Sequence, residues 1–305
     1  MSTGPKVSAP TSTAVGRITR IAVGVDGYAE GRDATVLGAT LARATGAEVM
    51  LVAVHPDPIV VLPREIGWRA MRKQAEALLR ETRDEIVPEA RLDVETDWSV
   101  PRALERVVVH ANRDLLVVGS SRRGEAGRVR IGSTTRQLLC HCRCALAVAP
   151  RGLSARPLRE LKRIGVGYDG TPESRAALSL AASVAATAGA RLKVRAVVDD
   201  RLPMVGWSPS RGLGQAMWDE LLEPRLTSLG QDAHDAVDET GATAEIEVLA
   251  GDPAGILIEL SGQVDLLVIG SRRWGAAVRV LLGTTGEALM HDAACPMLVV
   301  PRPAT

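Results

Sequence analysis

Phenylalanine is absent from this chain of 305 residues, and the other aromatic residues are few: five tryptophans and two tyrosines. A core without phenylalanine has to be built from Val, Leu, Ile and Ala, a composition typical of buried parallel strands covered by Ala-rich helices. Single-stranded nucleic acids are bound largely by stacking of their bases on aromatic rings. The shortage of such rings therefore indicates that nucleic acid is not a partner.

The chain also lacks an excess of charge of either sign. Lys and Arg number 37 and Asp and Glu number 36, so the formal net charge is +1 and no global field attracts nucleic acid or a membrane surface. No stretch of about 18 uncharged apolar residues exists, and we expect no transmembrane helix. Residues 1–17 are rich in Ser, Thr, Pro and Ala, so we expect a flexible tail and not a secretory signal.

Cysteine is scarce as well. Of the four cysteines, three fall in the segment Cys140-His141-Cys142-Arg143-Cys144 and the fourth is Cys295. This clustering leaves no dispersed disulfide framework, which indicates a reducing compartment such as the cytoplasm. A structural zinc site needs a second pair of ligands elsewhere, and none is available. We therefore interpret the segment as a helix end that enters a strand, with a metal or redox site as the alternative.

What the chain does contain is an internal repeat. The segment Arg20-Ile-Ala-Val-Gly-Val-Asp-Gly in the first half matches Arg163-Ile-Gly-Val-Gly-Tyr-Asp-Gly in the second. Both halves close on a short apolar strand followed by a proline, Pro150 or Pro301. We predict two copies of one domain, over residues 18–150 and 163–305, joined by a linker at 151–162.

Within each half, strands alternate with helices. The helical segments carry apolar residues at intervals of three and four, as in the run that begins at Ile66 and Ala70. Strands separated by helices predict a parallel sheet with right-handed crossovers and helices on both faces. The predicted fold class is α/β: two tandem doubly wound, Rossmann-like domains, each with a five-stranded parallel sheet in strand order 3-2-1-4-5.

One stretch occurs in both halves and suits an anion. Residues 119–134 and 270–285 each follow an apolar strand and contain a glycine, a serine, basic residues and a Gly-Ser or Gly-Thr pair that opens a new helix. Backbone N–H groups, the positive end of the helix dipole and a hydroxyl converge in such a loop, which favours a phosphate. In the expected strand order, Asp26 and Asp169 end the first strands and flank the same crevices. The spacing therefore indicates a nucleotide site in each half.

These features resemble the universal stress protein (UspA-like) family, and the whole chain resembles a tandem member of it. The marks are Asp-Gly after each first strand, Gly-Ser after each fourth strand, the pairs Gly132-Ser133 and Gly283-Thr284, the triplet Gly251-Asp252-Pro253 and the closing segment 295–301. The resemblance covers residues 18–150 and 161–302. Family members that bind ATP carry the motif G-x2-G-x9-G-[ST] in the loop after the fourth strand.

The resemblance implies an ATP site in each half. The strand-one aspartate would lie near the adenine, the backbone at the end of strand two would meet the base edge, and the glycine loop would hold the ribose and phosphates. The residues that match these roles are Asp26, Val54, Gly119, Arg122, Gly132 and Ser133 in the first half, and Asp169, Val197, Gly270, Arg273, Gly283 and Thr284 in the second. The resemblance also implies that the halves pack through their last strands, and that a homodimer of chains forms.

Both loops depart from the family motif at its second glycine, which is replaced by Arg122 and Arg273. A glycine there lets a phosphate approach the backbone closely, whereas an arginine side chain either fills that space or reaches the phosphates with its guanidinium group. The second half matches the motif better elsewhere, because Thr171-Pro172 is a good helix start where the first half has Tyr28-Ala29.

Other chemistries are indicated more weakly. The segment Gly165-Val-Gly-Tyr-Asp-Gly reads as a dinucleotide signature, but the first half has Ala22 in place of its first glycine. Asp26 and Asp169 are candidate general bases, yet no His, Ser or Lys partner lies at a recognisable spacing, and the alternative is that they cap the turns that follow them.

We therefore predict a cytoplasmic stress-response sensor or regulator that binds an adenine nucleotide and is not an enzyme. An interaction protein that binds no nucleotide and a slow ATPase are the alternatives.

Overall fold

The computed structural model describes residues 16–56, 64–200, 215–271 and 284–301. The elements of the first half are β1 (Arg20–Val25), α1 (Ala29–Thr45), β2 (Glu48–His55), α2 (Arg64–Ile86), β3 (Arg91–Thr96), α3 (Val100–His110), β4 (Leu115–Gly119), α4 (Ser133–His141) and β5 (Ala145–Ala149). Those of the second half are β6 (Arg163–Tyr168), α5 (Pro172–Ala188), β7 (Arg191–Asp199), α6 (Gln215–Thr240), β8 (Ala244–Gly251), α7 (Pro253–Ser261), β9 (Leu266–Gly270), α8 (Thr284–Asp292) and β10 (Met297–Val300). Most of the predicted tail, and the predicted site residues Arg273 and Gly283, lie outside the described residues.

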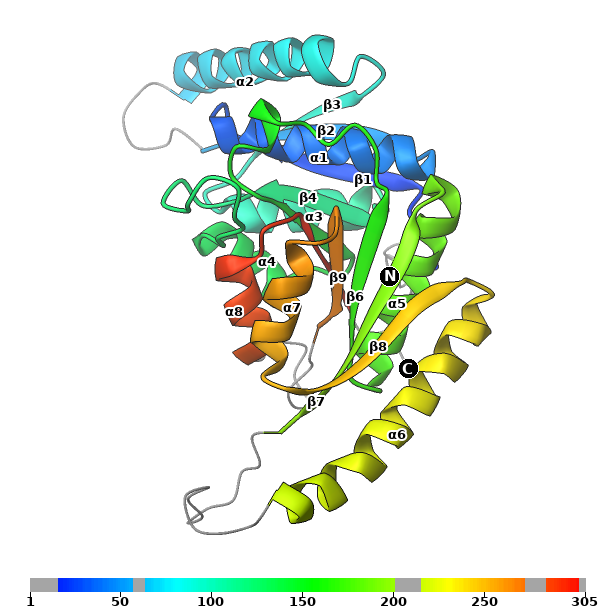
Figure 1. Ribbon diagram of the computed structural model, residues 1–305. Coiled ribbons are helices and arrows are strands. Elements are labelled where there is room, and N and C mark those ends of the chain that lie inside the picture. The colour runs from blue at the N-terminus through cyan, green and yellow to red at the C-terminus, as the bar shows by residue number, and fades with distance from the viewer. Residues whose placement is uncertain (1–15, 57–63, 201–214, 272–283, 302–305) are drawn as a thin grey trace, which may run out of the picture.

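All these strands form one continuous sheet, in the order β3-β2-β1-β4-β5-β10-β9-β6-β7-β8 (Figure 1). Read from its outer edge to the centre, each half has the strand order 3-2-1-4-5, as predicted. Strand pairs within each half are parallel, whereas β5 and β10 pair antiparallel, with Ala147 opposite Leu298. The halves therefore join through their last strands like the subunits of a two-fold dimer.

Helices cover both faces of the sheet. Buried side chains of α1, α2, α5 and α6 belong to one hydrophobic cluster, and those of α3, α4, α7 and α8 belong to another. Neighbouring residues of a strand divide between the clusters: Ile21 and Val23 belong to the first and Ala22 to the second. This alternation on a sheet buried on both sides explains why the strands are almost wholly apolar.

A pair of equivalent aspartates fixes where the first strand of each half begins. The Asp114 carboxylate, just before β4, accepts bonds from the N–H groups of Thr19 and Arg20, both at 2.9 Å. Asp265, just before β9, accepts from the N–H groups of Lys162 and Arg163 in the same way. These bonds align the first residues of neighbouring strands, so the carboxyl ends of the strands lie at the same edge of the sheet.

The segment that joins the halves is packed against the first half. Its Leu153 and Leu161 are buried, and it contains a short 3₁₀ helix, Leu153–Ala155. The fully buried carboxylate of Asp33 on α1 accepts bonds from the N–H groups of Gly152 and Ser154, both at 2.7 Å. The linker is therefore anchored by a charged group inside the first half.

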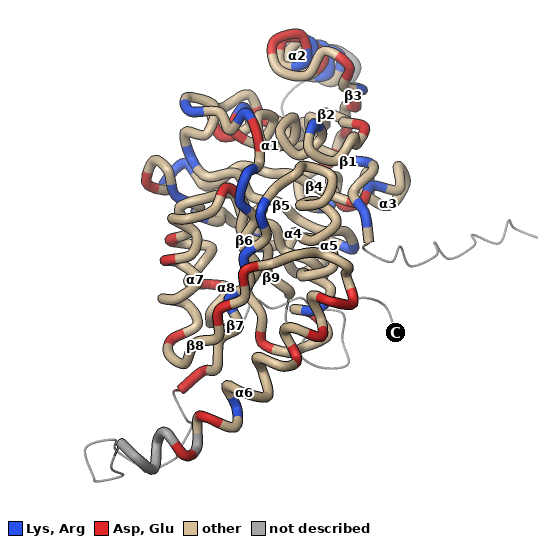
Figure 2. The backbone as a smooth tube through the Cα atoms, turned by 45° about the vertical axis from the view of Figure 1, so that its right-hand side comes forward, with Lys and Arg blue, Asp and Glu red and all other residues tan. Residues whose placement is uncertain are grey.

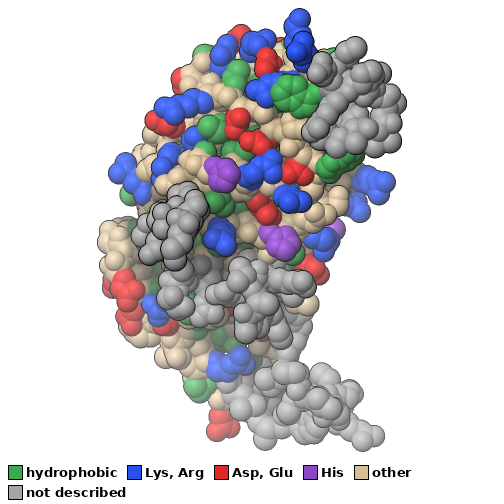
Figure 3. All heavy atoms as spheres, turned by 180° about the vertical axis from the view of Figure 1, so that it is seen from behind, with side chains coloured by type: hydrophobic (Ala, Val, Ile, Leu, Met, Phe, Trp, Pro, Cys, Tyr) green, Lys and Arg blue, Asp and Glu red, His purple; other side chains and the backbone are tan. Residues whose placement is uncertain are grey.

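The surface carries charges of both signs. Acidic residues recur along α6 (Figure 2), and α2 carries both basic and acidic residues. On the described part of the face opposite to that in Figure 1, basic and acidic side chains are interspersed (Figure 3). Among the described helices, none combines the length and the apolar character that a membrane span requires.

Candidate functional site

The first half has a cavity of about 300 Å³ at the carboxyl ends of β1, β2 and β4. All six residues predicted for this half line it: Asp26, Val54, Gly119, Arg122, Gly132 and Ser133. They come from the ends of three neighbouring strands and from the loop that leads into α4. The crevice therefore lies where a doubly wound sheet reverses its winding, as the strand order predicts.

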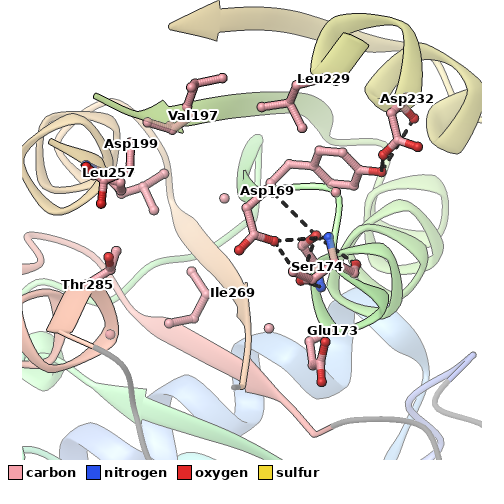
Figure 4. Close-up of a pocket in the computed structure, with 18 of the residues that line it drawn as sticks. Asp169, Glu173, Ser174, Val197, Asp199, Leu229, Asp232, Leu257, Ile269 and Thr285 are labelled. Carbon is pink, nitrogen blue, oxygen red and sulfur yellow. Dashed lines mark hydrogen bonds between the residues drawn. The ribbon is translucent and has the colours of Figure 1, made fainter. Parts of the chain in front are cut away.

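The second half has a larger cavity of about 750 Å³ in the equivalent place. The four predicted residues that the structure describes, Asp169, Val197, Gly270 and Thr284, all line it. Asp169 points into the cavity, with apolar side chains on either side of it (Figure 4). The two cavities thus occupy equivalent positions in the two repeats but differ in size.

Each strand-one aspartate caps the turn that follows it, which is one of the two roles considered from the sequence. Asp26 Oδ1 accepts a bond from the N–H of Tyr28 at 3.1 Å. Asp169 Oδ1 accepts from the N–H of Thr171 at 3.2 Å and from its hydroxyl at 2.6 Å. These bonds hold both carboxylates at the mouth of the cavity, beside the N-terminus of the next helix.

Thr171 caps α5 as predicted, since its hydroxyl oxygen accepts a bond from the N–H of Ser174 and Pro172 occupies the first helical turn. Tyr28, the equivalent residue in the first half, makes no side-chain cap to α1. The second half therefore has the better-ordered helix start, in agreement with the sequence.

The first glycine of each loop has a packing role that the sequence does not reveal. A Cβ atom added to Gly119 would collide with the backbone carbonyl of Glu30 in the first turn of α1. A Cβ atom added to Gly270 would lie 2.5 Å from the carbonyl oxygen of Glu173 in α5. The end of the fourth strand thus packs directly on a helix backbone, so these glycines are required whether or not a ligand binds.

Arg122 is one of the residues that line the first cavity. Its guanidinium carbon is 4.1 Å from the centre of the Tyr28 ring, an arrangement typical of a cation–π contact. Tyr28 is 52% exposed, so the pair is at the surface and its guanidinium N–H groups remain accessible to an anion. The arginine of the loop therefore stacks on the ring of the residue that precedes α1.

The helix that begins at each cavity supplies backbone donors. Gly132 precedes α4 with extended backbone and has no side chain with which to cap the first N–H groups of this helix. In the second half, Thr284 and Thr285 of α8 line the cavity. Uncapped N–H groups and the helix dipole attract an anion to such a helix start.

The walls of the second cavity also include residues that the sequence analysis missed. Leu229, Leu257 and Ile269 form apolar surfaces beside the predicted Val197, and Asp232 of α6 lies beyond them (Figure 4). Asp232 Oδ2 accepts a 2.6 Å bond from the Tyr168 hydroxyl, and burial together with this bond raises the pKa of Tyr168. The separation of Leu229 and Asp232 by three residues places them on one helix face, which is the only sequence signal for them.

The cysteine-rich segment lies where the sequence predicts, between the end of α4 and the start of β5. Cys142 and Cys144 are buried, with their sulfur atoms 3.4 Å apart. The hydrogen bond with Cys144 lowers the pKa of Cys142 and raises that of Cys144, while burial raises the pKa of Cys295 to about 12. Among the described residues, no group of three or more His, Cys, Asp or Glu side chains has the geometry of a metal site.

These thiols are expected to react in a definite order with iodoacetamide. A pKa of about 12 leaves only about one Cys295 in 10,000 as thiolate at pH 8, whereas Cys140 is half-buried and more accessible. Peptide mass spectrometry of the native protein should therefore find Cys140 alkylated first and Cys295 last. In guanidinium chloride all four should react at similar rates; equal rates for Cys140 and Cys295 in the native protein would contradict this order.

The fold and its crevices define a class, namely tandem doubly wound α/β proteins with a glycine-loop crevice in each half. The family model for the Universal stress protein family matches residues 17–150 and 160–301. The chain therefore belongs to the universal stress protein family.

Individual relatives agree with this assignment. The chain is 26% identical over 300 residues to a universal stress protein of Mycobacterium tuberculosis, across 92% of this chain and 96% of that protein. It is 33% identical over 148 residues to one of Methanocaldococcus jannaschii, across 47% of this chain and 83% of the relative. The crystal structure of a universal stress protein from Archaeoglobus fulgidus has the same fold, with a TM-score of 0.68 over 93% of this chain and 98% of the other, at 16% identity.

Proposed function

We propose that each half of this protein binds an adenine nucleotide, ATP, and that the protein acts in the cytoplasm as a stress-response sensor or regulator and not as an enzyme. The observation that carries the proposal is that ten residues, selected from the sequence for a nucleotide site, line two equivalent cavities. Each cavity combines an aspartate that caps a turn, an apolar wall and the N-terminus of a helix. This combination matches the needs of a ligand with a flat base, hydroxyl groups and phosphates.

In the second half, the proposed roles follow from the positions of the side chains. The base would pack between the apolar side chains of Val197, Leu257 and Ile269 (Figure 4). The Asp169 carboxylate would accept a bond from the base or ribose, because an ionised carboxylate is an acceptor only. The phosphates would lie at the start of α8, beside Thr284.

Calorimetric titration with ATP tests the proposal, with variants that fill one cavity at a time. Ser228→Trp adds a large ring to the second cavity from an exposed position on α6, and Val100→Trp does the same for the first cavity. We expect each variant to lose one binding event, with at least about tenfold weaker binding at the filled site. The stronger site should be lost in Ser228→Trp, because the second cavity, at about 750 Å³, lies well within the usual size range of ligand pockets, whereas the first, at about 300 Å³, is at its lower limit.

Ser179→Trp is the matched control, since Ser179 is an exposed residue of α5 that lines neither cavity. Its titration should equal that of the parent protein. No heat and no thermal shift with millimolar ATP would overturn the proposal, and steady release of ADP above background would identify an ATPase instead.

A second candidate, a first half that works without nucleotide, is favoured by the stacking of Arg122 on Tyr28 over the smaller cavity. The variant Arg122→Ala distinguishes a first half that binds ATP from a first half that works without nucleotide. If Arg122 contacts the phosphates, the variant should bind ATP about tenfold more weakly in the first half, because a hydrogen bond to a charged group contributes about 1.5–3 kcal/mol. The affinity should be measured with the second cavity filled by Ser228→Trp; tighter binding in Arg122→Ala would show that the arginine blocks the site.

A further inference from the structure

The glycine loop of the first half is held in place by the second half. After β4, the loop crosses to the end of α8, where the N–H of Val129 donates to the carbonyl of Ala293 at 2.9 Å and the N–H of Ile131 donates to the carbonyl of Met290 at 3.0 Å. The Arg128 guanidinium donates to the carbonyl of Asp292. The loop thus satisfies carbonyl groups that the last turn of α8 leaves without a partner inside the helix.

Side-chain packing strengthens this connection. Val129 and Ile131 are buried in the same hydrophobic cluster as Leu289, Met290 and Ala293. Ile131 comes directly before Gly132, which lines the first cavity. The shape of the first cavity therefore depends on the position of α8.

The same helix is part of the second cavity. Thr284 and Thr285 in its first turn line that cavity, and so does Leu289 near its end. Nine residues make α8 about 13 Å long, which is short enough for the helix to move as one rigid body. One end of α8 therefore meets the second cavity while the other end supports the loop of the first.

We propose that α8 couples the two nucleotide sites, so that a nucleotide in the second cavity changes the affinity of the first. This inference rests on the proposed nucleotide binding. Phosphates bound by the first turn of α8 displace the helix towards them, and the carbonyl groups at its other end move with it. The loop that contains Val129 and Ile131 either follows these carbonyl groups or loses its hydrogen bonds, and in both cases the first cavity changes shape.

Hydrogen exchange of single amides tests the coupling directly. In Val100→Trp, where the first cavity is filled, ATP can occupy only the second. We expect ATP to change the exchange rates of the Val129 and Ile131 amides by at least about threefold more than that of Val94 in β3. Val94 is the control because ligand binding also slows exchange through global unfolding, and that effect is common to all amides that exchange in this way.

Affinity measurements give the second readout. We compare the ATP affinity of the first site in two proteins: the parent protein, in which ATP occupies the second site, and Ser228→Trp, in which the tryptophan keeps ATP out of it. We expect the two affinities to differ at least about fivefold, which is the lower range of measured couplings. Arg128→Ala removes a side-chain link to α8 and lines neither cavity, and it should reduce this difference. ATP binding at both sites with equal first-site affinities and unchanged loop exchange would overturn the coupling, whereas no ATP binding at all would overturn the proposed function.

Discussion

Replacement of Gly119 by alanine is expected to destabilise the protein by about 3 kcal/mol or more, which is the range of severe overpacking in a core. The added Cβ would enter the carbonyl group of Glu30, and this carbonyl belongs to the backbone of α1, which cannot rotate away as a side chain could. Either β4 or α1 would have to shift, and both pack in the central core. Chemical denaturation followed by circular dichroism would measure the loss.

Gly132, another glycine of the same motif, is the matched control. An added Cβ on Gly132 would lie 3.7 Å from the Cβ of Ser121, an ordinary van der Waals distance, and its φ of −92° suits any residue. Gly132→Ala should therefore change the stability by less than about 1 kcal/mol. Equal denaturation midpoints for Gly119→Ala and Gly132→Ala would disprove the packing role of Gly119.

Asp33→Ala is expected to cost about 3 kcal/mol of stability. The substitution leaves two N–H groups of the linker, those of Gly152 and Ser154, without the carboxylate that accepts from them at 2.7 Å. Hydrogen bonds to a charged group contribute about 1.5–3 kcal/mol each, and part of this is recovered if water enters the space. Thermal unfolding monitored by calorimetry would measure the effect.

Asp26→Ala provides the comparison, because Asp26 is exposed and its carboxylate accepts a bond from the N–H of Tyr28 at the surface. Its loss should cost about 1 kcal/mol or less, as for other exposed caps. A loss of stability in Asp33→Ala no larger than that in Asp26→Ala would mean that the linker is not anchored by the buried carboxylate.

The comparison of the two halves shows how one motif acquires different local environments. Both loops lack the second glycine of the family motif, yet the first cavity is lined by Arg122, which stacks on Tyr28, whereas the larger second cavity is lined in part by α6, including Asp232. A duplicated domain can therefore keep its backbone while its two ligand sites diverge, because the residues around a crevice contribute little to the core.

The expectation that the halves join through their last strands came from the family resemblance, and the pairing of β5 with β10 confirms it. The sequence by itself determined the repeat, the α/β class and the strand order within each half. These features depend on periodic patterns: continuous apolar runs for buried strands, spacings of three and four for helices, and matching Asp-Gly turns. The same reasoning placed Asp26, Gly119 and Gly132 around one crevice, since the ends of neighbouring parallel strands meet at one edge of a sheet.

Only the tertiary structure decided which residues face one another across long separations. The bond from Arg128 to Asp292 joins residues 164 positions apart, and no local pattern predicts it. The collision that forbids a side chain at Gly119 depends on how closely a helix approaches a strand. Such contacts arise from the packing of whole elements, so the roles of α8, Asp33 and Asp232 emerge only once those elements are assembled.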